Sequence, residues 1–345
     1  MKWKPKYIIT DKLLFTIREI GEAMGAIKSF NLTEKALAKL ELDARELSSF
    51  ASTSIEGNPL ALTDVKLLLK TKKEYIRDTE REVLNYNNAL QNLYSSVRSN
   101  KFKLNITTLE RVQKQVTDDL MNNPADSGNL RQAPVIIRNP RKLNEIVFIP
   151  PDAKDIKQLT SELMDFINSH IGKVDPVILA GLFHRQCVII HPFIDGNGRS
   201  TRLLTTAILG EAGLDLFEIF SFENYYNQNI TRYFKFVGLE GDYYELKDTI
   251  DFTAWLEYFA EGILDELSRI RKALPNKIEQ KPRIEPHHRQ ILNYISEYGS
   301  ITQREYAKIS LRSLASRKLD IEKMLQLGVI ETKGAGRGTY YIKCP

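Results

Sequence analysis

The segment from His191 to Arg202 combines a base, a carboxylate, two glycines and two arginines in the run HPFIDGNGRSTR. His191 titrates near neutrality in its free form, so it can serve as a general base. Asp195 supplies a carboxylate of the kind that holds Mg²⁺ together with phosphate oxygens. Few chemistries other than the handling of a nucleotide's phosphates need all of these groups at once.

The two glycines form a break between two stretches with helical character. Pro192 and the glycines exclude a continuous helix, whereas residues 199–209 read as a helical start. The N–H groups of the turn and of the next helix N-terminus are therefore expected to point at an anion. Arg199 and Arg202 lie three residues apart on one helix face, where they can clamp a polyphosphate through bidentate contacts.

Each of these signals also has an ordinary structural explanation. A single His in an apolar stretch is usually a core residue, a Gly-Asn-Gly run is usually a turn, and an Arg pair usually lies on a solvated face. Their joint occurrence in this order is much harder to attribute to chance. The segment is therefore interpreted as a site for nucleotide phosphates.

The same run resembles the signature of the Fic-domain family, HPF-x-[D/E]-GNGR-x-x-R, and matches every fixed position of it. Members of that family typically transfer AMP from ATP to a protein hydroxyl on an all-helical core. The resemblance implies that His191 deprotonates the Ser, Thr or Tyr hydroxyl of a target protein. It also implies that Asp195 binds Mg²⁺ bridging the α- and β-phosphates of ATP.

The resemblance further assigns the nucleotide's phosphates to the turn and the start of the next helix. The implied contacts are Gly196, Asn197, Gly198, Arg199, Ser200, Thr201 and Arg202. The related Doc-type proteins, which transfer a phosphoryl group, carry Lys where this chain has Gly198. Gly198 therefore favours the AMP-transferring branch.

A second resemblance lies far upstream, in the run Ser52-Thr53-Ser54-Ile55-Glu56-Gly57. It looks like the inhibitory motif [S/T]-x-x-x-E-[G/N] found on a helix of many Fic proteins, which implicates Ser52 and Glu56. A Glu56 carboxylate paired bidentately with Arg202 would occupy the space that the γ-phosphate needs, and ATP would bind misaligned. Gly57 suits the left-handed end of a helix. Such a brake acts within one chain and requires no separate antitoxin.

Two short apolar runs, residues 135–138 and 146–149, flank turn residues and predict a β-hairpin that ends at Pro150-Pro151. Fic proteins have a hairpin flap at this place, on which the target segment is registered by strand addition. The resemblance thus assigns a flap role to Ile146, Val147, Phe148 and Ile149. An ordinary surface hairpin is the alternative.

No short motif marks the residues that would contact the adenosine of the nucleotide. Residues 221–236 are rich in aromatic side chains, and the family places an adenine-contacting aromatic in this region. Tyr233 is the residue chosen for that contact, although most of these aromatic rings are expected in the core. His184, seven residues before His191, is interpreted as a packed residue with a buried hydrogen bond.

Apolar residues recur at helical spacing in segments 80–97, 156–167, 176–190 and 252–270, which predicts long core helices. The expected fold is mainly α, a Fic-type helical core with a short hairpin flap, followed by a winged helix-turn-helix domain. The expected organisation is an N-terminal helical region with the inhibitory motif (1–78), a catalytic core (79–271), a Pro/Lys-rich linker (272–285) and the winged helix (286–345).

The C-terminal pattern is three helices, within 287–298, 302–307 and 311–327, followed by a hairpin within 329–342. The Gly-x-Gly-x-Gly run lies between the two strands, so it is read as a wing tip and not as a dinucleotide fingerprint. Residues 268–345 hold 16 Lys/Arg against 7 Asp/Glu, whereas the remainder holds 33 against 37. The cations proposed to face phosphates are Arg312, Arg317, Lys318, Lys323, Lys333 and Arg337. DNA binding and protein docking both stay open.

Composition sets broad limits on the chain. Of 345 residues, 42% are hydrophobic and 27% charged, which is ordinary for a globular protein. No apolar run reaches the roughly 20 residues of a membrane span, and the N-terminus lacks a secretory core. The two cysteines, Cys187 and Cys344, have no metal spacing, so a reducing cytoplasm is the expected location.

Three functions are compatible with these patterns. The leading one is a self-inhibited protein adenylyltransferase that uses ATP and Mg²⁺. The second is the reverse reaction, in which Glu56 positions water to remove AMP from a modified protein. The third is a DNA-binding regulator whose Fic core senses nucleotide. The resemblance is also compatible with a homodimer.

Overall fold

The computed structural model describes residues 3–30, 32–71, 73–139, 142–214, 216–274 and 285–344. The chain divides into two compact units, Met1–Ala273 and Leu274–Pro345. The expected inhibitory region 1–78 therefore belongs to the same unit as the helical core. Most of the expected linker 272–285 lies outside the described residues, and the last core helix continues through its first two positions.

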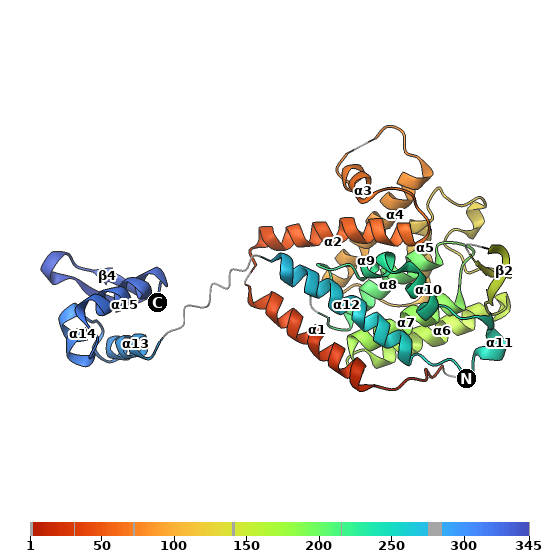
Figure 1. Ribbon diagram of the computed structural model, residues 1–345. Coiled ribbons are helices and arrows are strands. Elements are labelled where there is room, and N and C mark those ends of the chain that lie inside the picture. Colours follow the sequence, from red (N-terminus) through yellow and green to blue (C-terminus); the bar gives the residue numbers. More distant parts are fainter. Residues whose placement is uncertain are drawn as a thin grey trace. The chain divides into compact units, whose positions relative to one another are not determined.

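The first unit is built mainly of helices (Figure 1), as the sequence pattern predicted, and the mainly α fold class is confirmed. Its helices are α1 (Asp11–Ser29), α2 (Glu34–Ile55), α3 (Leu62–Leu68), α4 (Asp78–Arg98), α5 (Ile106–Val116), the 3₁₀ helix η1 (Pro124–Asp126), α6 (Ala153–His170), α7 (Pro176–Ile190), α8 (Asn197–Glu211), α9 (Phe222–Gln228), α10 (Ile230–Val237), α11 (Tyr243–Leu246) and α12 (Thr253–Ala273).

Helices α7 and α8 form the centre of this unit. Helix α7 is apolar around its whole circumference, and it packs against α6, α8 and α12. Asp175 caps its start by accepting from the N–H of Val177, with Pro176 at the first helical position. Helix α8 packs against α4, α5 and α7 and is buried although many of its residues are polar. A buried polar helix needs internal partners, and these partners define the site.

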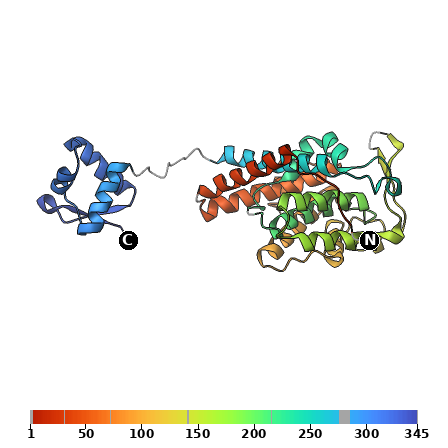
Figure 2. The same cartoon turned by 90° about the horizontal axis from the view of Figure 1, so that it is seen from below.

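The N-terminal helices cover this centre. Helix α1 lies along α12, and α2 packs against α4 and α9 (Figures 1 and 2). Thr10 and Thr33 cap α1 and α2 by accepting from the N–H groups of Leu13 and Ala36. The end of α2 also contacts α8, which brings the inhibitory motif to the central helix.

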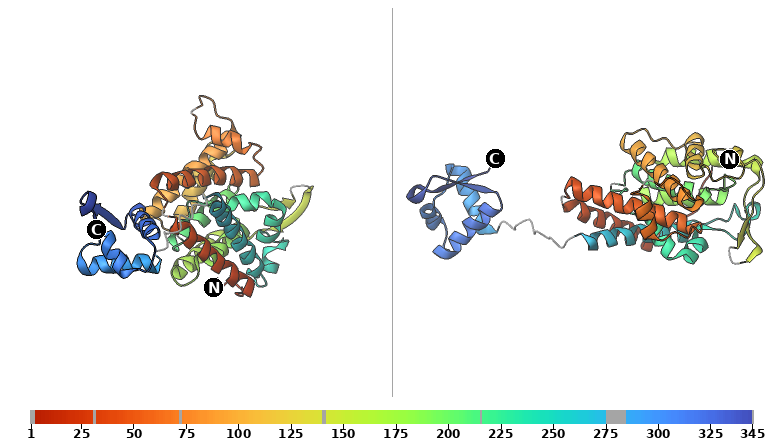
Figure 3. Two further views of the ribbon diagram at one scale, coloured as in Figure 1. Left: turned by 60° about the vertical axis from the view of Figure 1, so that its left-hand side comes forward. Right: turned by 90° about the horizontal axis from the view of Figure 1, so that it is seen from above.

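A hairpin lies at the edge of the helical unit (Figure 3). Strands β1 (Ile137–Asn139) and β2 (Lys142–Ile149) are antiparallel, and Ile137 is opposite Phe148. The end of β2 pairs in parallel with β3 (Gly241–Asp242). The hairpin was expected from the sequence, but β1 begins at Ile137 and not at Val135, and β2 begins earlier than Ile146. The expected turn at Pro140 lies outside the described residues.

The second unit contains three helices followed by a two-stranded antiparallel sheet, the order that the pattern predicted. Its elements are α13 (Pro286–Tyr298), α14 (Gln303–Ile309), α15 (Leu314–Gln326), β4 (Ile330–Lys333), the 3₁₀ helix η2 (Gly336–Gly338) and β5 (Tyr340–Lys343). Its core is formed by Ile291, Ile295, Ile301, Tyr306, Ile321, Met324 and Ile330. Among the described residues of both units, no helix has the length and apolar character needed to cross a bilayer.

The third helix of this unit starts later than expected. Ser313 caps α15 by accepting from the N–H of Ser316, so Arg312 lies in the preceding loop. The expectation that Arg312 lies within the third helix (311–327), the candidate recognition helix of the winged-helix pattern, is therefore wrong. Its guanidinium is bound to Asp320 at 2.8 Å.

The close approach of α7 and α12 yields a stability prediction. A Cβ atom on Gly181 would lie 2.8 Å from Leu256 Cδ2 and 3.0 Å from Phe259 Cδ1. Gly181→Val should lower the free energy of unfolding of this unit by roughly 1–3 kcal/mol through overpacking. Denaturant unfolding followed by circular dichroism would measure it. Gly21→Ala, where no atom lies within 4 Å, is the control and should stabilise by about 0.5–1 kcal/mol.

Candidate active site

His191 stands at the junction between α7 and the glycine turn. It ends α7 in the left-handed region (φ 53°, ψ 63°), and its N–H donates to the carbonyl of Cys187. A non-glycine residue with this backbone stores strain, which the surrounding contacts must hold in place. Its ring nitrogen Nδ1 lies 3.4 Å from the carbonyl of Val188.

The electrostatics around His191 favour its neutral form. Burial is the main cause that lowers the pKa of His191, to about 4, and the nearby guanidinium of Arg131 lowers it further. A neutral imidazole can accept a proton, as a general base must. His191 is therefore ready to act as a base throughout the physiological pH range.

The glycine turn leads directly into α8. Gly196 is the N-cap of α8 at φ 78°, and a Cβ atom there would also meet Thr117 Cγ2 at 2.8 Å. The side chain of Asn197 closes the turn: its Oδ1 accepts from the N–H of Phe193 and its Nδ2 donates to the carbonyl of the same residue. The first N–H groups of α8, those of residues 197–199, have no partner inside the helix. They are the amides that the sequence analysis expects to form an anion cradle.

Ser200 and Thr201 do not belong to this cradle. The N–H of Ser200 donates to the carbonyl of Gly196 at 2.9 Å, so it is committed to the helix. Both residues are at most 1% exposed. The second turn of α8 faces the protein interior in this structure, and phosphate contacts from these two residues stay a prediction.

Glu56 meets Arg202, as the inhibitory motif implied. Arg202 Nη2 lies 2.7 Å from Glu56 Oε1, while its Nε donates to Ser52 Oγ at 2.7 Å and its Nη2 donates to Ser52 O at 2.8 Å. The expected bidentate pair with Glu56 is wrong: the carboxylate takes one contact and Ser52 takes the rest. Gly57 follows at φ 96°, which lets the chain turn away after the helix end.

Arg202 is 1% exposed, so its buried charge needs the Glu56 carboxylate as a partner. Burial alone would lower the pKa of Arg202, but attraction to Glu56 raises it above its usual value, so the guanidinium stays charged. Glu56 also lies against the turn: a Cβ on Gly198 would fall on Glu56 Oε1. The carboxylate therefore sits beside the anion cradle.

Helix α2 is bound to the core by polar groups at four-residue spacing. Ser48, Ser52 and Glu56 lie on one helix face. Ser48 Oγ donates to Glu223 at 3.1 Å, and Tyr86 donates to the same carboxylate at 2.9 Å. Burial raises the pKa of Glu223. The inhibitory helix is thus fixed by a polar seam and not by apolar packing alone.

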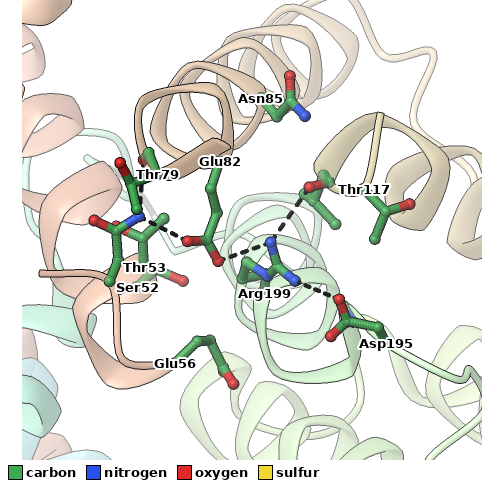
Figure 4. A network of polar contacts seen from close by, with 12 residues as sticks. Ser52, Thr53, Glu56, Thr79, Glu82, Asn85, Thr117, Asp195 and Arg199 are labelled. Carbon is green, nitrogen blue, oxygen red and sulfur yellow. Dashed lines mark hydrogen bonds and ion pairs between the residues drawn. The ribbon is translucent and has the colours of Figure 1, made fainter. Parts of the chain in front are cut away.

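Arg199 and Asp195 form a second pair of charges, with a partner that the sequence did not single out (Figure 4). Arg199 Nη2 lies 3.1 Å from Asp195 Oδ2, and its Nη1 lies 2.8 Å from Oε1 of Glu82 on α4. The N–H of Gly196 donates to Asp195 Oδ1 at 2.6 Å. No local motif surrounds Glu82, so only the packing of α4 against α8 reveals it.

Asp195 fits a site for Mg²⁺. Its side chain is 57% exposed, it stands at the entry to α8, and it is a hard oxygen donor beside an anion cradle. A cation here would be close to phosphate oxygens held by the amides of the turn. The donor set is a single protein carboxylate, which is typical of magnesium sites completed by phosphate and water.

Tyr233 lies in the core and not in an open site. It is 2% exposed, its hydroxyl lies 3.0 Å from His184 Nε2, and its ring stacks on Tyr226. An adenine contact would require an accessible ring face, so the geometry gives no support to that expectation. His184 is buried, and its Nδ1 lies 3.1 Å from Thr205 Oγ1, in agreement with its interpretation as a packed residue.

Arg131 links the hairpin to the catalytic turn and was also missed from the sequence. Its Nε donates to the carbonyl of His191 at 2.8 Å, its Nη2 to Pro151 at 2.5 Å and its Nη1 to Ala133 at 3.1 Å. These carbonyls belong to the turn and to both ends of the hairpin segment. Of the four expected flap residues, Phe148 is buried, while Ile146 and Ile149 are exposed and Val147 is partly buried.

The second unit contains a cluster of His287, His288 and Asp320 whose donor atoms lie within 4.8 Å of one another. His288 Nδ1 accepts from the N–H of Glu285 at 3.1 Å, so a neutral ring carries its proton on Nε2. That nitrogen is the one that faces Asp320, and a protonated nitrogen cannot bind a metal ion. With Arg312 and Tyr306 also bound to Asp320, the cluster is a structural network.

Residues 103–209 match the model of the Fic/DOC family. A protein named protein adenylyltransferase Fic from Drosophila virilis is 25% identical over 302 residues, which cover 85% of this chain and 58% of that protein. Its namesake from Drosophila erecta is 28% identical over 201 residues, covering 57% of this chain and 38% of that protein. The chain thus spans little more than half the length of the first relative, and less of the second.

Solved structures show the same fold. A Fic family protein from Desulfovibrio desulfuricans superposes with a TM-score of 0.62 at 20% identity and covers 99% of this chain and 98% of its own. A Fic domain containing signaling protein from Bacteroides thetaiotaomicron has a TM-score of 0.61 at 21% identity, over 74% of this chain and 96% of its own. The family match identifies residues 103–209 as a Fic domain, and the solved structures show that its fold is shared.

The depressed pKa of His191 can be measured directly. In an NMR titration of ¹³C-labelled histidine, the ring of His191 should titrate near pH 4, because burial disfavours its charged form. Since this value lies below the 6.5 of an ordinary His, the stability it contributes is present above pH 6.5 and is lost as the pH falls towards 4. His191→Gln assigns the resonance, and a midpoint near 6.5 would contradict the prediction.

Proposed function

We propose that the protein is a self-inhibited protein adenylyltransferase, which transfers AMP from ATP to a Ser, Thr or Tyr hydroxyl of a target protein. The observation that carries the proposal is the arrangement of His191, Asp195 and the amides of residues 197–199 around one turn, with Glu56 against the same turn. The match of residues 103–209 to the Fic/DOC family and the names of the relatives support the same reaction.

The proposed reaction follows from the chemistry of these groups. His191 accepts the proton of the target hydroxyl, and the hydroxyl oxygen attacks the α-phosphorus of ATP. The new oxygen–phosphorus bond forms while the bond from the α-phosphorus to the bridging oxygen breaks. Pyrophosphate leaves with that oxygen. The amides of the turn and the guanidinium groups of Arg199 and Arg202 hold negative charge on the outer phosphates.

Asp195 would hold Mg²⁺ in this proposal. Such an ion supplies charge neutralisation to the triphosphate. The chain would place the Asp195 carboxylate at the start of α8, within reach of the ion. The N–H of Gly196 donates to Asp195 Oδ1 and so orients that carboxylate.

Inhibition would come from competition for Arg202. The guanidinium is held by Ser52 and Glu56, so an outer phosphate can reach it only if Glu56 leaves. ATP that binds beside Glu56 would have its α-phosphate misaligned for in-line attack. The same carboxylate would therefore lower the rate without closing the site to nucleotide.

Other parts of the proposal go beyond the catalytic site. The hairpin β1–β2 would register the target segment, with Ile146 and Ile149 facing outwards. Residues 286–345 would form a winged helix that docks on DNA or on a protein through exposed residues such as Lys318 and Lys323. A homodimer and a cytoplasmic location stay expectations of the sequence.

Glu56→Gly should raise ATP-dependent AMP incorporation by about ten- to a hundredfold, because Arg202 becomes available and the α-phosphate can align. Labelled ATP and detection of self-modification or of modified lysate proteins would measure it. His191→Ala in the Glu56→Gly background should abolish the signal, because the hydroxyl loses its base.

Glu34→Gly, at the exposed start of the same helix, is the matched control and should leave the rate unchanged. A Glu56→Gly protein that is folded, binds ATP and shows no gain in transfer would remove the brake from the proposal. A His191→Ala variant with full activity would remove the base.

Arg202 should affect ATP binding in the Glu56→Gly variant and inhibition in the parent chain. In the Glu56→Gly background, Arg202→Ala should weaken ATP binding by about tenfold or more, since one charge-assisted phosphate contact is lost. Titration calorimetry measures this affinity. In the parent chain, Arg202→Ala should not activate as Glu56→Gly does, because the guanidinium serves inhibition and ATP use alike. Strong activation by Arg202→Ala alone would contradict that shared role.

A further inference from the structure

Glu82 stands between the inhibitory segment and Arg199. We infer that Asn58 and Glu82 form a second inhibitory contact, which withholds Arg199 from the outer phosphates in the same way that Glu56 withholds Arg202. The inference rests on the proposed function, since it takes both arginines to be phosphate ligands. It adds two residues of the N-terminal half of the chain to the regulation of the site.

Both terminal nitrogens of the Arg199 guanidinium have oxygen partners, whereas its buried Nε has none. Nη1 lies 2.8 Å from Glu82 Oε1 and 3.4 Å from the carbonyl of Val116, and Nη2 lies 3.1 Å from Asp195 Oδ2. The residue is 5% exposed. A phosphate can contact both Nη1 and Nη2 only by displacing an oxygen from Nη1, which already has two oxygen partners.

Asn58 connects Glu82 to the inhibitory segment. Figure 4 shows that Glu82 reaches Arg199 on one side and that Thr79 and the end of α2 lie on its other side. Asn58 Nδ2 donates to Glu82 Oε2 at 2.7 Å and to the carbonyl of Thr79 at 2.8 Å. Asn58 is two residues after Glu56, and its own N–H donates to Thr53 O on α2. The two oxygens of Glu82 are thus divided between the inhibitory segment and Arg199.

The charges around Arg199 determine whether Glu82 strengthens or weakens the binding of ATP. A triphosphate brings several negative charges to Arg199, and the Glu82 carboxylate would lie close to them. Asp195 would be neutralised by Mg²⁺ under the proposed function, whereas Arg199 is the cation that the structure gives Glu82. Glu82 therefore competes with the phosphates for this guanidinium, and the Asn58 contact fixes it in the competing position.

In this arrangement the inhibitory segment, residues 56–58, acts on both arginines. Residues 56–58 reach Arg202 directly through Glu56 and Arg199 indirectly through Asn58 and Glu82. Removal of the Glu56 carboxylate alone leaves the second contact in place. The Glu56→Gly chain should therefore still bind ATP less tightly than it could.

The test compares ATP and AMP in the Glu56→Gly background. By titration calorimetry with Mg²⁺, Glu82→Gln should tighten ATP binding by about tenfold, the effect of one charge-assisted hydrogen bond. AMP, which has no outer phosphates, should bind unchanged. Asn85→Ala is the control: it lies one turn further on α4, and its Nδ2 donates to the carbonyl of Asp118.

Asn58→Ala gives an independent second variant. In the same background it should tighten ATP binding by a smaller factor, and it should add nothing to Glu82→Gln, because both variants break one shared contact. Weaker or unchanged ATP binding by Glu82→Gln, or an equal change for AMP, would overturn the inference.

These outcomes are distinguishable from failure of the proposed function. If the Glu56→Gly chain binds ATP but transfers no AMP, the proposed function fails while the binding comparison still decides the role of Glu82. If it transfers AMP and Glu82→Gln leaves the ratio of ATP to AMP affinity unchanged, the inference fails and the proposed function stands.

Discussion

The structure depends on a buried positive charge that has to be balanced. Arg202 is 1% exposed on a central helix, and a guanidinium in that position is tolerable only with anions or oxygens around it. In this chain the end of α2 supplies them, through Ser52 and Glu56. The position of α2 is therefore tied to the electrostatics of α8, in addition to the packing of α1 on α12 and of α2 on α4 and α9.

The same constraint organises the surroundings of the turn. Arg199 and Arg131 are buried as well, and each collects oxygen atoms from segments far apart in the sequence: Arg199 from α4 and the turn, Arg131 from the turn and both ends of the hairpin segment. Three arginines thus hold the inhibitory segment, the α4 helix and the hairpin around one short loop. These contacts hold the loop in place, whereas its glycines provide the backbone geometry that the turn requires.

The sequence could predict the residues that share a local pattern. The break before α8, the extent of α7, the hairpin and the order of the C-terminal elements all follow from periodicity, glycine and proline placement, although α8 begins at Asn197 and not at Arg199 as expected. Glu82, Asn58 and Arg131 could not be found in this way, because each acts through a single long-range contact. The burial of Ser200, Thr201 and Tyr233 was not apparent from the sequence for a related reason: a motif orders residues along the chain but does not say which face of a helix is buried.

The contact between Glu56 and the backbone of Gly198 has an evolutionary consequence. A Cβ at position 198 would coincide with the Glu56 carboxylate oxygen, so even Ala would push that carboxylate off its place beside Arg202. Under the proposed function, a side chain at position 198, such as the Lys of the Doc-type proteins, would displace Glu56 and weaken the inhibition. The absence of a Cβ atom at position 198 would thus link the type of group that is transferred to the way in which the transfer is inhibited.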